Sequence, residues 1–566
     1  MAKRARNSNG SSGGNPENGN VSGRELVVKM QGDAQFRSSL NTGPTALAAD
    51  AAPFAELLSN FGAEIEPLFG LPEERMRSIA TAAGPSVAEG EMETYYAVTA
   101  PDKKLDELAE AILDQSKLVE AAYVKPQSTE PVGLAESDDD TINEMMPLAG
   151  DGPPASPDFT ASQIYLNPAP AGIDARYAWS IAGGRGAGVK IIDCEWGWNF
   201  SHEDLLQKQI GVVFGGNSSN NNHGTAVLGE YSADVNTFGV TGICSDAIAG
   251  ASSFVNTPST ARTIREAADR LSAGDIILLE IHRAGPNATG SGQFGYIAVE
   301  WWPDDFAAIR YAVNKGIIVV EAAGNGSQNL DAAVYNTRPA NFPASWRNPF
   351  NPANPSSHAV LVGAGAPPPG THGRNHGADR SRLGFSNYGK RVDCQGWGRE
   401  VTTAGYGNLQ GGNRNIWYTE TFSGTSSASP IVVGALGCVQ GILKAQGSPV
   451  LTPTGAINLL RTTGSPQQDT PGRPKTQRIG NRPNLRQMIP AAAKTWRNNV
   501  SVTRVYATYH SKNAWAAISG MGWRKIETGS DDGVTNMLML LTEACASGQR
   551  VDVYADGSKL YRAVQR

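Results

Sequence analysis

The chain has 566 residues, 40% of them hydrophobic and 18% charged, and its formal net charge is −6 at pH 7. This length exceeds what one compact core holds and predicts several domains. The small negative charge argues against a nucleic-acid-binding protein that works through a global positive field. The five cysteines are widely spaced and form no C-x-x-C pair, which argues against a disulfide framework and against a zinc site.

The sequence shows no recognisable secretory signal or membrane segment, and this sets the expected location. The basic N-terminus, MAKRARNSNG, is not followed by an apolar segment, so it does not resemble a secretory signal. No apolar run approaches the ~20 residues that a membrane helix needs, so no membrane partner is expected. We therefore expect a cytoplasmic protein, with export by another route left open.

The first 126 residues divide into a tail and a small α+β unit. Residues 1–23 are rich in Asn, Gly and Ser and predict a disordered tail. In 24–126 the predicted order is β-α-β-β-α-β, which is typical of a ferredoxin-like unit. The predicted strands are ELVVKM, EIEPLF, ETYYAVTA and VEAAYVKP, and the predicted helices are PFAELLSNFG and LDELAEAILDQ.

A linker is predicted at 127–161, because this stretch contains the acidic run ESDDD and the turn-rich GDGPPASPD. In 162–490, continuous apolar strands alternate with helical segments such as 305–315. The strands are VKIIDC, DIILLEI, GIIVVEAAGNG and HAVLVGAGA. This pattern predicts an α/β fold with a parallel sheet covered by helices on both faces, and ligand sites at the carboxyl ends of its strands.

The last segment, 491–566, predicts a small α/β module without a catalytic motif. Its predicted strands are SVTRVYATYH, GWRKIE and RVDVYA, and its predicted helices are NAWAAISG and DGVTNMLMLLTEACASG. The module could recognise a partner or substrate, or it could cover the preceding domain. Its aromatic residues are expected to serve the core of the module more than a binding surface.

Three polar residues lie near the ends of predicted elements in the central segment, and together they suggest nucleophilic catalysis. Ser426 in FSGTSSASP can act as a nucleophile if a base removes its proton. His223 in NNNHGTAVLGE can be that base at neutral pH. Asp193, at the end of VKIID, can fix the imidazole tautomer and stabilise the imidazolium. Pro430 predicts the first turn of a buried helix, which would leave Ser426 at its positive end.

The central segment resembles the subtilases, the subtilisin-like serine peptidases. The resemblance rests on VKIIDCEWGWNFSHEDL, NHGTAVLGE, VVEAAGNG, GFSNYGKRVDCQGWG and FSGTSSASP, in that order. The order Asp, His, Ser is the one known from subtilisin. The resemblance implies a subtilisin-like fold and a serine endopeptidase that works through an acyl-enzyme. It also implies that the side chain of Asn325 and the backbone N–H of Ser426 form the oxyanion hole.

The unit at 24–126 is similar in order and position to the inhibitory prodomain of many subtilases. This similarity implies a zymogen that cuts itself in the linker, with the prodomain as an intramolecular partner and a peptide or protein as substrate. No cofactor and no metal site are expected. A structural calcium ion is compatible with the resemblance, although no sequence signal indicates one.

Two departures from the family leave alternatives open. Glu280, Ile281 and His282 stand where the family has a Ser-Leu-Gly-like run that pairs with substrate, so His282 could narrow the cleft or make it polar. The chain could therefore be a catalytically idle subtilase fold that binds a peptide or protein. Glu195 points to the same side of its strand as Asp193. An extra acid role is one interpretation of Glu195, and a solvated carboxylate is the simpler one.

Overall fold

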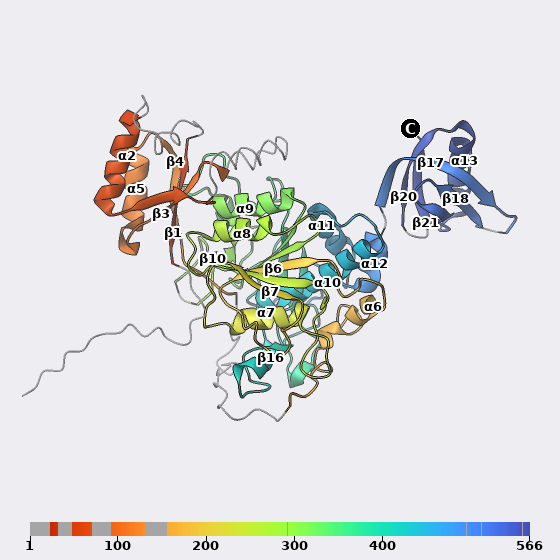
Figure 1. Ribbon diagram of the computed structural model, residues 1–566, viewed down its shortest axis with the longest axis horizontal. Coiled ribbons are helices and arrows are strands. Elements are labelled where there is room, and N and C mark those ends of the chain that lie inside the picture. Colours follow the sequence, from red (N-terminus) through yellow and green to blue (C-terminus); the bar gives the residue numbers. More distant parts are fainter. Residues whose placement is uncertain are drawn as a thin grey trace, which may run out of the picture.

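The computed structural model describes residues 23–31, 48–70, 92–131, 155–290, 292–493, 495–510, 512–556 and 559–565. Three units follow one another along these residues (Figure 1). The predicted tail at 1–23 lies outside them except for Gly23, and most of the predicted linker, 132–154, does so as well.

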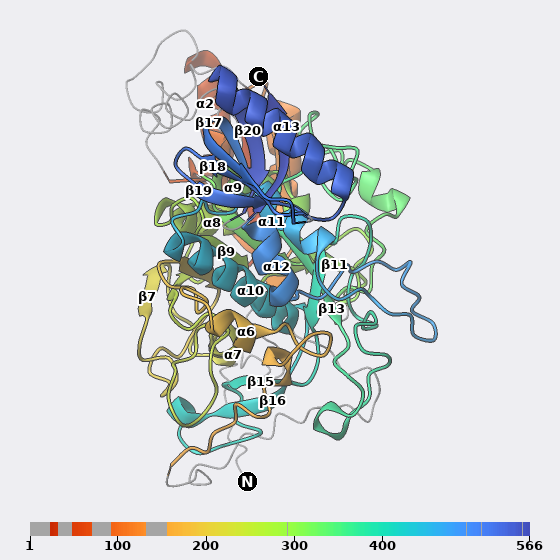
Figure 2. The ribbon, with the colours of Figure 1, turned by 90° about the vertical axis from the view of Figure 1, so that its right-hand side faces the viewer.

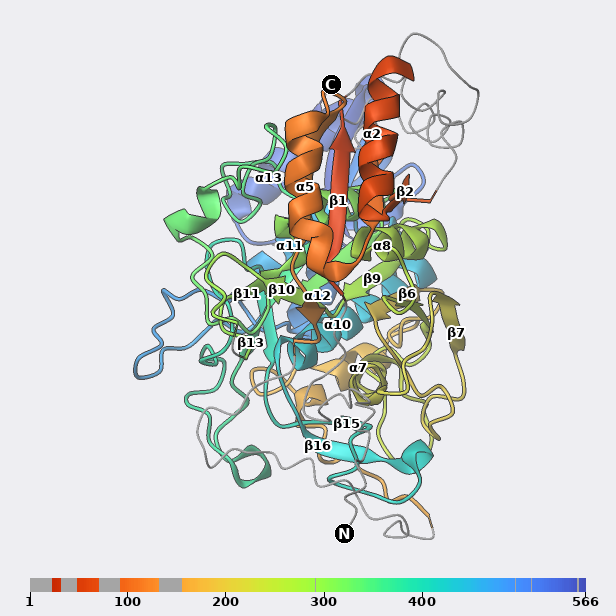
Figure 3. The same cartoon turned by 90° about the vertical axis from the view of Figure 1, so that its left-hand side faces the viewer.

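The N-terminal unit has the predicted ferredoxin-like order. Its antiparallel sheet runs β2-β3-β1-β4, and helices α2 and α5 lie on one face of that sheet (Figure 3). The elements are β1 (Glu25–Met30), α2 (Ala48–Phe61), β2 (Glu64–Pro67), β3 (Tyr95–Thr99), α5 (Leu105–Gln115) and β4 (Val119–Lys125). Helix α5 buries an apolar stripe at i, i+3, i+4 and i+7, which is why it packs flat on the sheet. The other face packs against two helices of the central unit, α8 and α9.

The central unit is built on a parallel sheet with the order β14-β13-β12-β9-β6-β8-β7. Its strands are β6 (Lys190–Glu195), β7 (Gln209–Phe214), β8 (Ile248–Ser253), β9 (Ile276–Leu279), β12 (Ile318–Ala322), β13 (Val360–Gly365) and β14 (Cys394–Trp397). Helices α8 (Thr260–Asp269) and α9 (Pro303–Asn314) cover one face. Helices α7 (Asn222–Ser232), α10 (Thr425–Ala445), α11 (Pro453–Thr462) and α12 (Leu485–Ala492) cover the other face. This is the doubly covered parallel sheet that the apolar strands predict.

Helix α10 is long and apolar enough to cross a membrane by length and composition, contrary to the expectation that no segment approaches that size. Its apolar window is completely buried inside the protein, where it packs against β12, β13 and β14. A core helix of a folded domain passes the same test, and α10 has that position here.

A short antiparallel sheet joins the N-terminal and central units. Its order is β11-β10-β5, with β5 at Ser128–Thr129, β10 at His282–Ala284 and β11 at Tyr296–Ala298. Strand β5 follows the N-terminal unit directly, so the end of that unit is added as an edge strand to the central unit.

The C-terminal unit is a closed barrel with the strand order β17-β18-β19-β21-β20, and helix α13 (Asp531–Ser547) packs on it (Figure 2). The strands are β17 (Thr495–Ala507), β18 (Ala514–Ile518), β19 (Gly522–Ile526), β20 (Arg550–Ala555) and β21 (Lys559–Gln565). The predicted helix NAWAAISG is wrong, because 514–518 forms a strand paired on both sides. Pairing with two neighbours outweighs the high helix propensity of its alanines. The barrel has a hydrophobic core of its own.

Candidate active site

The candidate residues meet at the carboxyl end of the parallel sheet, where the sequence predicts them. Asp193 and Glu195 are the last residues on one side of β6, and His223 lies in the first turn of α7. Asn325 follows β12, and Ser426 lies in the first turn of α10. All five side chains are buried.

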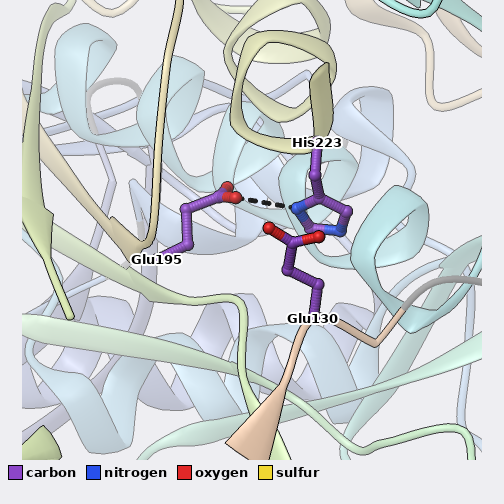
Figure 4. A group of neighbouring side chains, drawn as sticks. All are labelled: Glu130, Glu195 and His223. Carbon is purple, nitrogen blue, oxygen red and sulfur yellow. Dashed lines mark hydrogen bonds and ion pairs between the residues drawn. The ribbon is translucent and has the colours of Figure 1, made fainter. Parts of the chain in front are cut away.

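His223 contacts a different carboxylate from the predicted one. Its Nδ1 lies 2.8 Å from Oε2 of Glu195 (Figure 4). The carboxylate of Asp193 instead accepts a hydrogen bond of 2.7 Å from Nε1 of Trp198. The interpretation of Glu195 as a solvated carboxylate is therefore wrong: its side chain is fully buried. Strand alternation places Asp193 and Glu195 on one side, and the longer glutamate is the one that reaches the ring.

Burial and crowding disfavour negative charge around this histidine. Burial raises the pKa of Glu195 well above its usual value, and Glu130 raises it further. Burial also raises the pKa of Asp193, with the neighbouring Glu195 adding to the effect. Burial lowers the pKa of His223, while Glu130 and Asp193 oppose this change. The surroundings therefore favour the neutral form of each of these groups: a protonated carboxyl for Asp193 and Glu195, and a neutral imidazole for His223.

Glu280 is one more buried acidic group near Asp193, Glu195 and Ser426. It follows β9, its side chain is fully buried, and neither carboxylate oxygen has a hydrogen-bond partner of good geometry among the described residues. Burial raises its pKa well above the usual value, Asp193 and Glu195 raise it further, and the nearby Ser426 offsets part of the rise. These surroundings favour the neutral, protonated form of the Glu280 carboxyl group.

Ser426 faces a segment of its own chain. Its Oγ donates a hydrogen bond of 2.9 Å to the carbonyl oxygen of Pro131, three residues past the start of β5. Helix α10 begins at Thr425, so Ser426 is at the positive end of the helix as predicted. Pro430, however, lies one turn inside the helix rather than in its first residues, because the helix starts earlier than predicted.

Asn325 is fixed with its amide nitrogen toward the cleft. Its Oδ1 accepts hydrogen bonds from the backbone N–H of Thr425 (3.0 Å) and from the hydroxyl of Thr425 (2.9 Å). The amide nitrogen must therefore point the other way, where it donates to Oε1 of Gln293 at 3.1 Å. Gln293 in turn donates to the carbonyl oxygen of Glu130 at 3.1 Å. These contacts join the predicted oxyanion donor to the segment in the cleft.

The segment 128–131 lies in the cleft as an extended strand. Thr129 is opposite His282 in the antiparallel pair, and Ser128 is opposite Arg283. His282 therefore does not close the cleft, although it stands where the family has a small residue. Ile281 is fully buried and belongs to the core beneath the strand.

The tautomer of His282 follows from its neighbours. Its Nδ1 accepts the backbone N–H of Asn325 at 3.3 Å, so the ring proton is on Nε2. Nε2 lies 3.0 Å from Oγ1 of Thr129 and donates to that hydroxyl. Burial lowers the pKa of His282 to about 3, so the ring is neutral at physiological pH.

Three contributors to the site escaped the sequence predictions: Glu130, Gln293 and Trp198. Glu130 brings a carboxylate from the cleft segment to His223 and Glu195, and donor atoms of these three residues lie within 4.8 Å of one another. An imidazole and two carboxylates are ligands that a divalent cation accepts. The Nδ1 of His223 is already engaged by Glu195, however, and this contact is the one drawn in Figure 4. Only the tryptophan had a usable signal, since it follows Asp193 closely in DCEWGW.

Comparisons with known proteins find sequence similarity to subtilases. The model of the subtilase family matches residues 214–480. Thermitase of Thermoactinomyces vulgaris is 28% identical over 320 residues, which cover 54% of this chain and 90% of thermitase. An intracellular serine protease of Paenibacillus polymyxa is 26% identical, covering 53% of this chain and 81% of that protein. An extracellular serine proteinase of a Thermus species is 32% identical, but over only 29% of its length. The epidermin leader peptide processing serine protease of Staphylococcus aureus is 16% identical, with a TM-score of 0.46, covering 84% of this chain and all of that one.

Proposed function

The chain belongs to the subtilase family of serine peptidases, and we propose that it cleaves peptide bonds in proteins through an acyl-enzyme on Ser426. Ser426 attacks the carbonyl carbon, and Nε2 of His223 takes its proton and returns it to the leaving amine. The amide of Asn325 and the backbone N–H of Ser426 receive the developing oxyanion. A buried carboxyl group on β6, from Asp193 or Glu195, orients the imidazole.

One observation carries this proposal. A peptide of the same chain, 128–131, lies in the cleft as an extended strand, with its Pro131 carbonyl 2.9 Å from Oγ of Ser426. An extended backbone paired with an edge strand is the geometry in which a peptidase presents a scissile bond. We therefore propose that the protein is made as a zymogen, that 24–131 inhibits it, and that it cuts itself at or after Pro131.

The alternative is an idle fold that only binds peptide, which the buried Glu280 and the substitution at His282 suggest. His223 Nε2 has no hydrogen-bond partner within the described part of the chain, since Ser426 turns to Pro131 instead. Displacement of the serine by the occupying segment accounts for this geometry in a zymogen, so we favour the enzyme. A cytoplasmic location stays a prediction, because relatives carry both intracellular and extracellular names.

A fluorophosphonate probe tests the proposal. Such probes modify only an activated serine, so the wild-type chain should react once its N-terminal unit has been removed, and Ser426→Ala should not. Ser429→Ala is the matched control, because the hydroxyl of Ser429 donates to the carbonyl oxygen of Thr425 within its own helix. The purified wild type should be found cut between 131 and 161, whereas Ser426→Ala stays full length. A wild type that stays intact, and that does not react after trypsin has removed the N-terminal unit, would be an idle fold.

A further inference from the structure

We propose that Glu195, and not Asp193, is the residue that positions His223 for catalysis, with Asp193 as a second carboxyl group that shares a proton with it. This inference rests on the proposed function, and it assigns the acid of that site. Glu195 acts through the histidine, so it is a positioning residue and not a group that touches substrate.

The contact itself is the first argument. The 2.8 Å between Nδ1 of His223 and Oε2 of Glu195 is a hydrogen bond of ordinary length. When Glu195 is ionised, the proton of this bond lies on Nδ1, which leaves Nε2 free to accept the proton of a serine. Glu195 thus fixes the tautomer that general-base catalysis needs.

Trp198 is the second argument, because it holds Asp193 in another role. The indole N–H donates to Oδ2 of Asp193 at 2.7 Å, and the indole is almost fully buried. If Asp193 turned toward His223, this N–H would lose its partner in a place that water does not reach. An unsatisfied buried donor is costly, so the aspartate stays with the indole.

The third argument is the charge balance of the pair. Asp193 Oδ1 and Glu195 Oε1 find no donor among the described residues, and the two carboxyl groups are close enough that Glu195 raises the pKa of Asp193. Two buried carboxylates this close cannot both be ionised. One proton between them satisfies both oxygens and leaves a single negative charge, which Glu195 presents to the imidazolium.

Further ionisable groups lie around this pair on every neighbouring element. They are Cys194 on β6, Glu230 and Tyr231 on α7, Glu280 after β9, His282 on β10 and Glu130 after β5. Glu130 is the only one that belongs to the segment whose removal we propose. In the mature enzyme, which lacks Glu130, the pH profile should therefore depend on the Asp193–Glu195 pair and not on Glu130.

The test compares two isosteric substitutions in the mature enzyme. Glu195→Gln removes the charge that faces His223, and we expect a loss of about 10³–10⁴ in kcat with KM little changed, as for loss of a triad aspartate elsewhere. Asp193→Asn keeps a hydrogen-bond donor toward Glu195, so its kcat should fall by about tenfold or less. Circular dichroism and the thermal midpoint show whether each variant is folded.

The pH dependence of kcat/KM shows whether Glu195 positions His223 or only packs beside it. The acid limb of kcat/KM reports the protonation of His223. Without the anion beside it, the imidazolium is less stable, so the limb should move to lower pH in Glu195→Gln. In Asp193→Asn the limb should stay where it is. Glu195→Asp, which restores a carboxylate on a shorter side chain, should recover part of the kcat that Glu195→Gln loses.

The opposite ranking would overturn the inference: an Asp193→Asn enzyme that loses about 10³-fold or more while Glu195→Gln stays within about tenfold. An unmoved acid limb in Glu195→Gln would overturn it as well. Both results leave the proposed function intact, since the wild type still labels and cleaves. Failure of the proposed function is seen separately, as a wild type that neither reacts with the probe nor cleaves peptide.

Discussion

At the scale of single residues, His282 replaces the small residue of the family with a side chain that contacts the peptide. Its proton is fixed on Nε2 and is donated to the hydroxyl of Thr129. Thr129 is the third residue before the bond that follows Pro131. The position therefore favours threonine or serine in a substrate, since valine offers the same shape without an acceptor.

Matched peptides with Thr or Val at this third position measure the preference. One neutral hydrogen bond contributes about 0.5–1.5 kcal/mol, which predicts a ratio of roughly 2–10 in kcat/KM for the wild type. His282→Leu should bring the ratio close to one. Leu also removes the acceptor of the backbone N–H of Asn325, but that loss affects both peptides equally and cancels in the ratio. Peptides with Thr or Val at the fourth residue before the cleaved bond serve as control. If His282→Leu left the Thr/Val ratio at the third residue unchanged, a group other than His282 would contact that side chain.

The residues of the site were predictable to different degrees, for physical reasons. Ser426, His223 and Asn325 stand in short motifs, and each lies directly after a strand or at a helix start. Which carboxylate reaches His223 was not predictable, because strand alternation places Asp193 and Glu195 on the same side. Side-chain length and the position of Trp198 decide it. Glu130 comes from a distant segment, and no local pattern indicates its place.

At the scale of elements, helix α7 places His223 through a close packing contact. A Cβ on Gly224 would lie 2.4 Å from the carbonyl oxygen of Gly197 and 2.6 Å from the ring of Trp198. The first turn of α7 therefore rests directly on the loop that carries Trp198. Any side chain at position 224 must separate the helix from that loop and move His223 away from Glu195.

Gly224→Ala tests this contact. Overpacking of a tight contact costs about 1–3 kcal/mol, so we expect a thermal midpoint lowered by a few degrees. The rate of labelling by a fluorophosphonate should fall by at least tenfold, because the imidazole is displaced. Gly529→Ala is the control, since a Cβ there meets nothing within 4 Å. A Gly224→Ala protein that labels at the wild-type rate would mean that the helix can shift without moving the ring.

Elements were predicted best where one apolar face is continuous. Four strands of the parallel sheet, β6, β9, β12 and β13, and helix α5 lie where the apolar pattern predicts them, because burial on both faces or on one stripe leaves a clear pattern. Strands β7, β8 and β14 of the same sheet were not predicted. In the barrel, short strands depend on pairing across the chain. Strand β18 resembles a helix locally, and β21 lacks a strong alternating pattern, so neither was predictable from local sequence.

At the scale of the whole molecule, the N-terminal unit is held to the central unit by buried charges as well as by β5. Lys125 at the end of β4 is completely buried, and its Nζ lies 2.6 Å from Asp304 and 2.9 Å from Asp305 at the start of α9. It also pairs with Glu25 of its own unit at 2.9 Å. Burial alone would lower the pKa of Lys125, but Asp304 and Asp305 raise it above its usual value.

Lys125→Met should release the unit without changing its fold. The substitution keeps the volume of the side chain and removes the cation that pairs directly with both buried aspartates. Breaking such a pair costs about 3–5 kcal/mol, which corresponds to a roughly 10²–10⁴-fold weaker docking. In a Ser426→Ala background, which cannot cut itself, the amides of β5 and β10 should exchange their hydrogens faster by a comparable factor.

Two further variants make this result specific to the buried network. Lys117→Met removes the same charge from an exposed position of the same unit and should leave the exchange of β5 and β10 unchanged. Adding Asp304→Asn and Asp305→Asn to Lys125→Met replaces the interrupted network by neutral groups and should recover much of the protection. If Lys125→Met exchanged as slowly as the parent, β5 and the apolar face of the sheet would suffice for docking. In that case the Lys125 network would not affect how long the N-terminal unit stays bound to the central unit after the chain is cut behind Pro131.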